Sequence, residues 1–101
     1  MSVYMLIETE VVDADAYAQY QARIPAVVAQ YGGRYIIRGG PVVPLTGDCT
    51  PQRIILLEFE TAGAMRAWNE SPEYQELAPL RMAGAKTRAV ALQGHVDDLD
   101  Y

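Results

Sequence analysis

Two glutamates and two arginines within apolar segments are the residues of this chain best suited to acid–base and anion chemistry. Glu8 and Glu58 lie in two of these segments, and Arg34 and Arg38 lie in a third. A glutamate walled by aliphatic side chains has a raised pKa and exchanges protons near neutrality. The planar guanidinium of arginine binds a carboxylate through two parallel hydrogen bonds. These residue types predict a site in which arginines hold a carboxylate or enolate ligand and a glutamate acts as general base.

A buried glutamate–arginine network that tunes the pairing of two subunits is the alternative interpretation of the same residues. Structural ion pairs perturb pKa values as active sites do, so residue types alone leave both interpretations open. A raised pKa of Glu58 beside an open cavity would favour the catalytic interpretation. A filled chamber in which every glutamate is matched to an arginine would favour the structural one.

Aromatic side chains form a second set of candidates, because their hydroxyl groups and rings can orient a ligand. Tyr4 lies in the same segment as Glu8, and Trp68 precedes a break in a helical stretch where it would line the mouth of a pocket. Aromatic residues at helical spacing also build cores and interfaces, which is the alternative. The other tyrosines that would present hydroxyls to a ligand are Tyr17, Tyr20, Tyr31, Tyr35 and Tyr74.

The only histidine and the only cysteine carry little functional signal. His95 is followed by Asp97, Asp98 and Asp100, but this spacing matches no metal-ligand signature, so we expect a solvated tail and no metal site. A histidine that reaches the partner subunit as an acid or base is the alternative. Cys49 lacks the signature of an activated thiol. No glycine motif fits a nucleotide loop, so we expect no cofactor.

The elements that must position these residues alternate as β-α-β-β-α-β, which predicts an α+β, ferredoxin-like fold with a four-stranded antiparallel sheet. One helix is expected to begin after Asp13 and to end near Tyr31. A second helical stretch begins after Thr61 and restarts after Ser71, which is a second capping residue. The expected strands cover residues 3–11, 33–38, 53–60 and 86–94.

These strands are apolar on both faces, although the helices can cover only one face of the sheet. The uniformly apolar face, which carries Met5, Leu57 and Phe59, is expected to pack on the helices. The opposite face mixes aliphatic side chains with the glutamates, and an apolar patch of that size is uncommon on monomers. The sequence therefore predicts a homodimer paired through its sheet faces, with a ligand chamber between the two sheets.

Strict alternation assigns the side chains of the second strand. It places Arg34, Ile36 and Arg38 on the face with the glutamates, and Tyr35 and Ile37 on the helix face. Both arginines are therefore expected in the chamber between the sheets.

Composition limits the classes of function. The 101 residues predict one domain over residues 1–94, followed by an acidic tail over 95–101. The net charge of −5 disfavours nucleic acid and anionic membranes as partners. No apolar run approaches the ~20 residues that cross a bilayer, and residues 1–12 lack a signal peptide's features. With a single cysteine, these features lead us to expect a cytoplasmic protein.

Several short motifs follow one another over most of the chain: Gly32-Gly33-Arg34-Tyr35, Arg38-Gly39-Gly40, Gly47-Asp48, Glu58-Phe59, and Trp68 with Ser71-Pro72-Glu73-Tyr74. In these motifs the chain resembles the domain-of-unknown-function family numbered 1330. The resemblance covers about residues 3–94 and implies a dimeric α/β barrel of the ferredoxin-like superfamily. Wider relatives include cofactor-free monooxygenases, lactone isomerases, haem-handling enzymes and stress-response proteins, so the resemblance implies no single activity. Relatives often carry Trp after Gly-Asp, where this chain has Cys49.

The preferred function is therefore binding of a small, partly apolar molecule. The arginines favour a ligand that carries an acidic group. If the protein turns over a substrate, we expect cofactor-free proton transfer or oxygenation of an enolisable molecule. Arg38 would then orient the substrate, Glu58 or Glu8 would take the proton, and Tyr35 or Tyr4 would assist. A dimeric binding or stress-associated module without turnover is the alternative.

Overall fold

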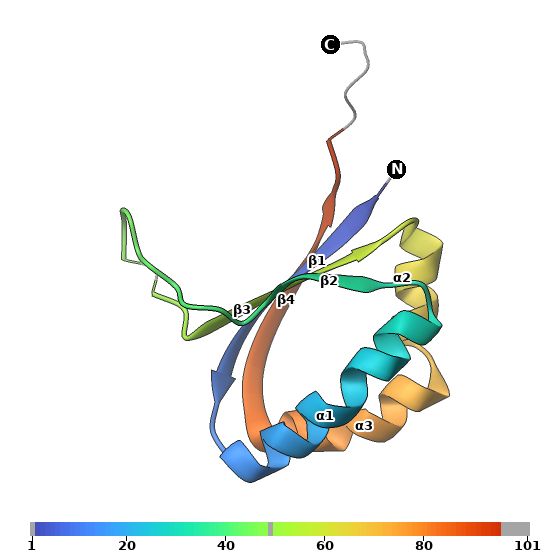
Figure 1. The fold of residues 1–101 in the computed structure, drawn as a ribbon, viewed down its shortest axis with the longest axis horizontal. Coiled ribbons are helices and arrows are strands. Elements are labelled where there is room, and N and C mark those ends of the chain that lie inside the picture. The colour runs from blue at the N-terminus through green and yellow to red at the C-terminus, as the bar shows by residue number, and fades with distance from the viewer. Residues whose placement is uncertain (1, 49, 96–101) are drawn as a thin grey trace.

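The computed structural model describes residues 2–48 and 50–95, which form a four-stranded antiparallel sheet with helices on one side (Figure 1). The strand order is β2-β3-β1-β4. The predicted α+β, ferredoxin-like fold is confirmed, with the second helical stretch divided into two helices. The elements are β1 (Val3–Val11), α1 (Ala14–Gln30), β2 (Arg34–Arg38), β3 (Arg53–Phe59), α2 (Ala62–Asn69), α3 (Pro72–Gly84) and β4 (Ala85–Gln93).

Each helix begins after the capping residue that the sequence indicates. The Asp13 carboxylate accepts hydrogen bonds from two backbone N–H groups in the first turn of α1, at 3.1 and 3.2 Å. The Thr61 hydroxyl accepts the first-turn N–H of α2 in the same way. Ser71 accepts the N–H of Tyr74 and donates its hydroxyl to the carbonyl of Trp68. Ser71 therefore joins the end of α2 to the start of α3, because one hydroxyl satisfies both helix ends.

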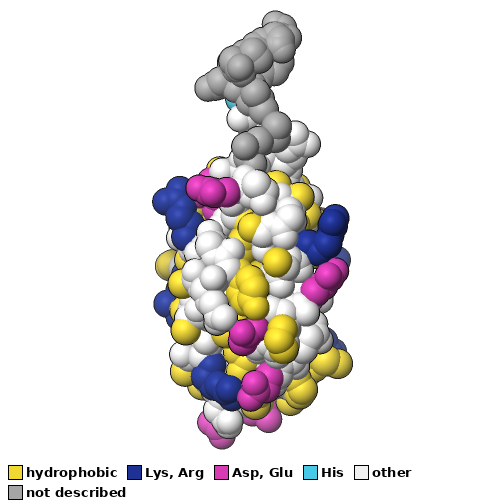
Figure 2. Space-filling view, turned by 90° about the vertical axis from the view of Figure 1, so that its right-hand side faces the viewer, with side chains coloured by type: hydrophobic (Ala, Val, Ile, Leu, Met, Phe, Trp, Pro, Cys, Tyr) yellow, Lys and Arg dark blue, Asp and Glu magenta, His cyan; other side chains and the backbone are white. Residues whose placement is uncertain are grey.

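The core lies between the helices and the side of the sheet that faces them, as predicted. Leu57 and Phe59 of β3 are almost completely buried there, together with Val28, Trp68 and Leu77 from the helices. The Trp68 ring lies between Phe59 and Tyr74, with ring centroids 5.6 and 4.5 Å away. Figure 2 shows the molecule from the helix side, with apolar side chains in the centre of the view. Acidic and basic side chains are interspersed around them, and neither sign of charge forms a separate patch.

Strand β2 contains a β-bulge. Tyr35 pairs with Leu57 of β3, but the next pair in the register joins Ile37 to Leu56. Ile36 is therefore an extra residue without a place in the register, and the strand bends at this point.

The bulge reverses the faces predicted for the end of β2. Arg38 pairs with Ile55, whose side chain packs against the core, so Arg38 lies on the helix side of the sheet. Ile37 lies on the other side and is 44% exposed. The prediction that Arg38 shares a face with Arg34 and the glutamates is wrong, because strict alternation holds only in a strand without a bulge.

No helix in residues 2–48 and 50–95 is both long and apolar enough to cross a membrane. Within the same residues, the connection between β2 and β3 extends away from the helices (Figure 1). Its apolar side chains Val43 and Leu45 are 74% and 92% exposed.

Candidate functional site

Two adjoining cavities lie between the sheet and the helices, and together they are called the helix-side cavities here. One has a volume of about 180 Å³ and the other about 30 Å³. A cavity of about 150 Å³ is large enough for benzene, so the larger one has room for a single ring. The two share the lining residues Ile7, Tyr17, Tyr20 and Ile55.

Two arginines form the polar wall of the smaller cavity. The guanidinium carbon of Arg38 lies 5.0 Å from the centroid of the Tyr35 ring, and that of Arg53 lies 5.7 Å from the centroid of Tyr17. Arg53 donates to the backbone carbonyls of Gly39 and Arg38 at 3.5 and 3.4 Å, which are long hydrogen bonds. Its buried Nε has no hydrogen-bond partner in the structure. Both guanidinium groups thus lie over aromatic rings, and some of their N–H groups make no hydrogen bond to the protein.

Arg38 reaches helix α1 at the carbonyl that a proline leaves free. Pro25 lies inside α1 and has no N–H for the carbonyl of Gln21, four residues before it. The Nη2 of Arg38 lies 3.5 Å from that Gln21 oxygen. The bulge in β2 and the proline in α1 therefore act together, because one turns Arg38 toward the helix and the other supplies an acceptor.

The larger cavity carries tyrosine hydroxyls and a third arginine. Burial, together with the neighbouring Tyr74, raises the pKa of Tyr20 well above its ordinary value. In the smaller cavity, burial also raises the pKa of Tyr35, an effect that the positive charges of Arg38 and Arg53 partly oppose. Both hydroxyls are therefore neutral near pH 7 and can donate a hydrogen bond to a ligand.

Arg81 is the third arginine, and it lines the larger cavity. It donates from Nη1 to the hydroxyl of Thr87 at 2.8 Å, while its buried Nε has no hydrogen-bond partner. The Nε1 of Trp68, in a side chain that lines the smaller cavity, is likewise buried without a partner. Unpaired buried donors cost free energy, so these atoms mark places where a ligand's acceptor would be stabilised.

The charges around the helix-side cavities are unbalanced. The residues lining the two cavities include three arginines and no aspartate or glutamate. None of the three forms an ion pair with a carboxylate in the described part of the chain. This local excess of positive charge contrasts with the net charge of −5 of the whole chain.

The other side of the sheet, called the open face here, holds the predicted glutamates in ion pairs. Glu58 of β3 accepts from the Nε of Arg34 at 2.6 Å and from the hydroxyl of Tyr4 at 3.1 Å. Hydrogen bonds from Ser2 and Arg34, with a smaller one from Tyr4, hold the pKa of Glu58 below its usual value against the opposing effect of burial. The predicted rise in this pKa is therefore wrong, because the donors stabilise the carboxylate.

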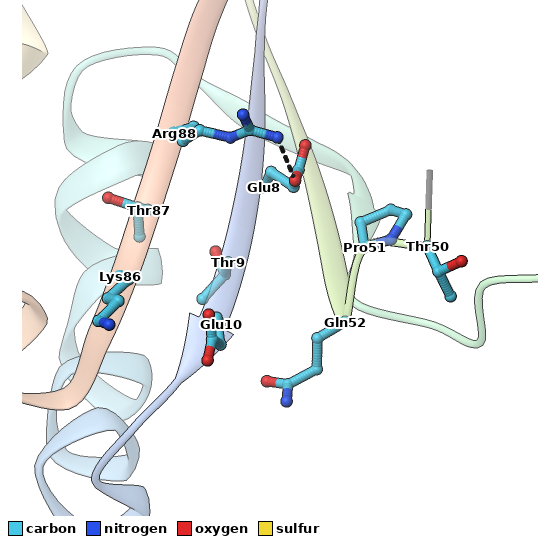
Figure 3. Close-up of a pocket in the computed structure, with 9 residues that line it drawn as sticks. All are labelled: Glu8, Thr9, Glu10, Thr50, Pro51, Gln52, Lys86, Thr87 and Arg88. Atoms are coloured by element: carbon cyan, nitrogen blue, oxygen red, sulfur yellow. Dashed lines mark hydrogen bonds and ion pairs between the residues drawn. The ribbon is translucent and has the colours of Figure 1, made fainter. Parts of the chain in front are cut away.

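Glu8 is also paired on the open face. Figure 3 shows Arg88 of β4 directed across β1 toward Glu8, with 2.7 Å between Nη2 and the carboxylate. This pair borders a polar surface cavity of about 520 Å³, lined by both signs of charge at the end of β1. Lys86 lies opposite Glu10 in the register of the same two strands. The charges here are balanced, in contrast to those of the helix-side cavities.

The eight predicted site residues are thus divided between two faces of the sheet. The open face carries Glu8, Glu58, Arg34 and Tyr4, whereas the helix side carries Arg38, Tyr35, Trp68 and Tyr74. The prediction missed Arg53 and Arg81. For Arg53 a signal existed, because it shares the alternation of Ile55 and Leu57 that marks the helix face. For Arg81 the signal is helical spacing, because it follows Tyr74 by seven residues and Leu77 by four, on the buried face of α3.

The tail and loop candidates lie largely outside the described residues. Cys49 and the three aspartates that follow His95 are not among them. Within residues 2–48 and 50–95, no group of three His, Cys, Asp or Glu residues is placed to hold a metal ion.

Comparisons with known proteins agree on the fold. The family model "Domain of unknown function (DUF1330)" matches residues 2–95. No curated protein matches the chain. A protein of unknown function from Rhodopseudomonas palustris is similar with a TM-score of 0.79 and 21% identity, over 94% of this chain and 83% of its own.

Two other solved structures share the architecture. A dimeric ferredoxin-like protein of unknown function from Jannaschia sp. CCS1 has a TM-score of 0.70 and 16% identity, over 93% of this chain and 100% of its own. SnoaB, a cofactor-independent oxygenase from Streptomyces nogalater, has a TM-score of 0.65 and 13% identity, over 94% of each chain. At these identities the similarity establishes the fold and leaves the function to the site.

Proposed function

Because the chain belongs to the DUF1330 family, whose description names no activity, we propose a function from the geometry of its sites. The protein is a homodimer that binds a small, partly apolar molecule in the helix-side cavities of each subunit. This moves the predicted ligand site from a chamber between two sheets to the layer between sheet and helices.

One observation carries this proposal: apolar walls and convergent polar groups meet at a cavity of single-ring size. Ile7 and Ile55 supply apolar wall to both cavities, and Tyr17 and Tyr20 add aromatic surface. Arg38 and Arg53 converge on the same space from the sheet. A concave, mostly apolar site with a few placed polar groups is the usual form of a small-molecule site.

The open face supports the homodimer. Val90 and Leu92 of β4 are about half exposed there, and so is Ile37 of β2 at the opposite edge of the sheet. The ion pairs of Glu8 and Glu58 already neutralise the charges that dimerisation would desolvate. A second copy would cover this apolar surface, and the neighbour from Jannaschia is a dimeric protein. This is the structural role that the glutamate–arginine network suits.

The same geometry favours binding over general-base catalysis by a glutamate. No carboxylate lines either helix-side cavity, and the pKa of Glu58 lies below its ordinary value. Neutral tyrosines and arginines stabilise an enolate or a carboxylate but do not take a proton near neutral pH. If turnover occurs, the tyrosine hydroxyls and arginines would hold the substrate while an external base or oxygen reacts with it.

A cavity-filling variant tests the location of the site. Ala89 lines the larger cavity, so Ala89→Phe should fill it and abolish binding of single-ring compounds. Ala22→Phe places the same side chain at an exposed position of α1 and serves as control. Binding is measured as the ligand-induced rise in unfolding temperature of each dimer. Equal ligand-induced rises in wild type and in Ala89→Phe would refute the helix-side location.

A further inference from the structure

We infer that the ligand of the helix-side cavities is a planar anion, a small aromatic carboxylate or enolate whose charged end lies between Arg38 and Arg53. This inference rests on the proposed function and adds the charge and orientation of the ligand. Three observations support it: the long hydrogen bonds of the two arginines, the lack of an acidic residue in the cavity lining, and the aromatic and aliphatic walls of the cavity.

Their hydrogen bonds leave most of the donor capacity of Arg38 and Arg53 free. A guanidinium has five N–H donors in a planar fork. The protein contacts of Arg53 are two carbonyls at 3.4 and 3.5 Å, and its Nε has none. Arg38 has one hydrogen bond within the described part of the chain, at 3.5 Å to the Gln21 carbonyl, besides its contact with the Tyr35 ring. Such long contacts orient the two groups while leaving N–H donors for a stronger acceptor.

Two neighbouring cations without a counter-ion are destabilising unless an anion joins them. Arg38 lies opposite Ile55, two residues along β3 from Arg53, and Nη2 of Arg53 reaches the backbone carbonyl of Arg38, so the two side chains start close together on the helix side of the sheet. The lining of the smaller cavity contains no acidic residue that would neutralise them. A carboxylate between the two would supply the missing charge and accept hydrogen bonds from both forks.

The rest of the cavity selects a flat, apolar body for this anion. Tyr17 and Tyr35 lie under the two guanidinium groups, and Ile55 continues the wall into the larger cavity. A ring attached to the carboxylate would extend from the arginines toward that larger volume of about 180 Å³. The ligand is therefore expected to enter ring first, with its acid group left beside Arg38, the more exposed of the two arginines.

Gly39 makes the position of Arg53 possible. A Cβ built on Gly39 would lie 2.2 Å from the guanidinium carbon of Arg53, and the glycine has a φ of +76°. The adjacent Gly40 has open space at the same point. Gly39→Ala should therefore displace the Arg53 guanidinium, whereas Gly40→Ala should leave it in place. Gly47→Ala, at a φ of +80° with open space, controls for the backbone strain of Gly39→Ala.

Benzoate and benzamide test the charge requirement, because they share a shape and differ in charge. Trp68 is the only tryptophan and lines the smaller cavity, so its fluorescence reports occupancy of the dimeric protein. We expect benzoate to bind at least about tenfold more tightly than benzamide. Equal binding of the two probes would overturn the anion inference and leave the proposed function standing. Failure of both to bind at millimolar concentration would contradict both.

Variants then assign the charge to its residues. Arg53→Gln should weaken benzoate binding about tenfold or more, with little effect on benzamide. Arg34→Gln removes an arginine from the open face and should leave benzoate binding unchanged. Gly39→Ala should behave as Arg53→Gln does, and Gly40→Ala as wild type. A loss of benzoate binding in Arg34→Gln equal to that in Arg53→Gln would overturn the assignment.

Discussion

Arginines lie on both faces of the sheet, but only those on the open face are paired with carboxylates. On the open face, Arg34 and Arg88 are each matched to a glutamate, and hydrogen bonds lower the pKa of Glu58. On the helix side, Arg38 and Arg53 lie in a cavity wall that contains no carboxylate. An arginine of this sheet therefore indicates a ligand site only where its counter-ion is missing. An arginine–glutamate ion pair stabilises the protein or an interface, whereas two arginines without a carboxylate partner stabilise an anionic ligand.

The largest effect is expected from a change that damages only the helix side. A Cβ on Gly84 would lie 2.5 Å from the backbone nitrogen of Tyr17, so Gly84→Ala should push α3 away from α1. We expect a loss of about 3 kcal/mol in the free energy of unfolding, together with loss of ring binding. Gly63→Ala, whose nearest contact would be 3.8 Å away, is the control and should be close to neutral. Denaturant unfolding measures both, and equal stability of the two variants would contradict the close packing of α1 on α3.

The next effect isolates the open face. Val90 lies opposite Leu6 and is 53% exposed, so Val90→Glu would bury an unpaired charge in the proposed dimer. We expect the dimer dissociation constant to rise by about a hundredfold, with the fold retained. Met82→Glu, at an exposed apolar position of α3, is the matched control. Sedimentation measures both, and a Val90→Glu protein as dimeric as the control would show that the open face is not the interface.

A smaller effect concerns the pH dependence of stability. The pKa of Glu58 lies below its ordinary value of 4.5 in the folded protein, so its carboxylate form favours folding. This contribution is complete above pH 4.5 and is lost as the pH falls through the folded pKa. Glu58→Gln should therefore make the acid side of the stability profile shallower and leave benzoate binding intact. An unchanged slope in urea titrations between pH 2 and pH 6 would argue against the Arg34–Glu58 pair.

The smallest effect is expected at the link between Pro25 and Arg38. Pro25→Ala restores an N–H to the Gln21 carbonyl, which no longer needs the Arg38 donor. We expect stability to change by about 1 kcal/mol or less, and benzoate binding to weaken a few-fold because Arg38 is less well oriented. Arg38→Gln should weaken benzoate binding more strongly. In the Arg38→Gln protein, Pro25→Ala should have no further effect on benzoate binding. Additive losses in the double variant would show that the two residues act independently.

The fold was largely predictable because its signals are local. Asp13, Thr61 and Ser71 mark the helix starts through their own hydrogen bonds, and the alternation of Ile55, Leu57 and Phe59 marks the buried face. The site was less predictable because it depends on register. A strand of five residues is too short for its pattern of polar and apolar residues to reveal a bulge. Arg38 was therefore assigned to the wrong face.

The ion pairs on the open face were hidden for a related reason. Glu8 is matched to a residue 80 positions later in the chain, and this pairing follows only from the order of strands in the sheet. The pKa of Glu58 likewise depends on Arg34 and Ser2, which come from other segments. Arg53 could have been found from its position in β3, since it shares the parity of the buried residues.

A crystal structure of the protein with benzoate would show whether the ligand site lies in the helix-side cavities. We expect electron density for one ring in the helix-side cavities of each subunit, with the carboxylate between the guanidinium groups of Arg38 and Arg53. Density for benzoate between two sheets, beside Arg34 and Glu58, would contradict it.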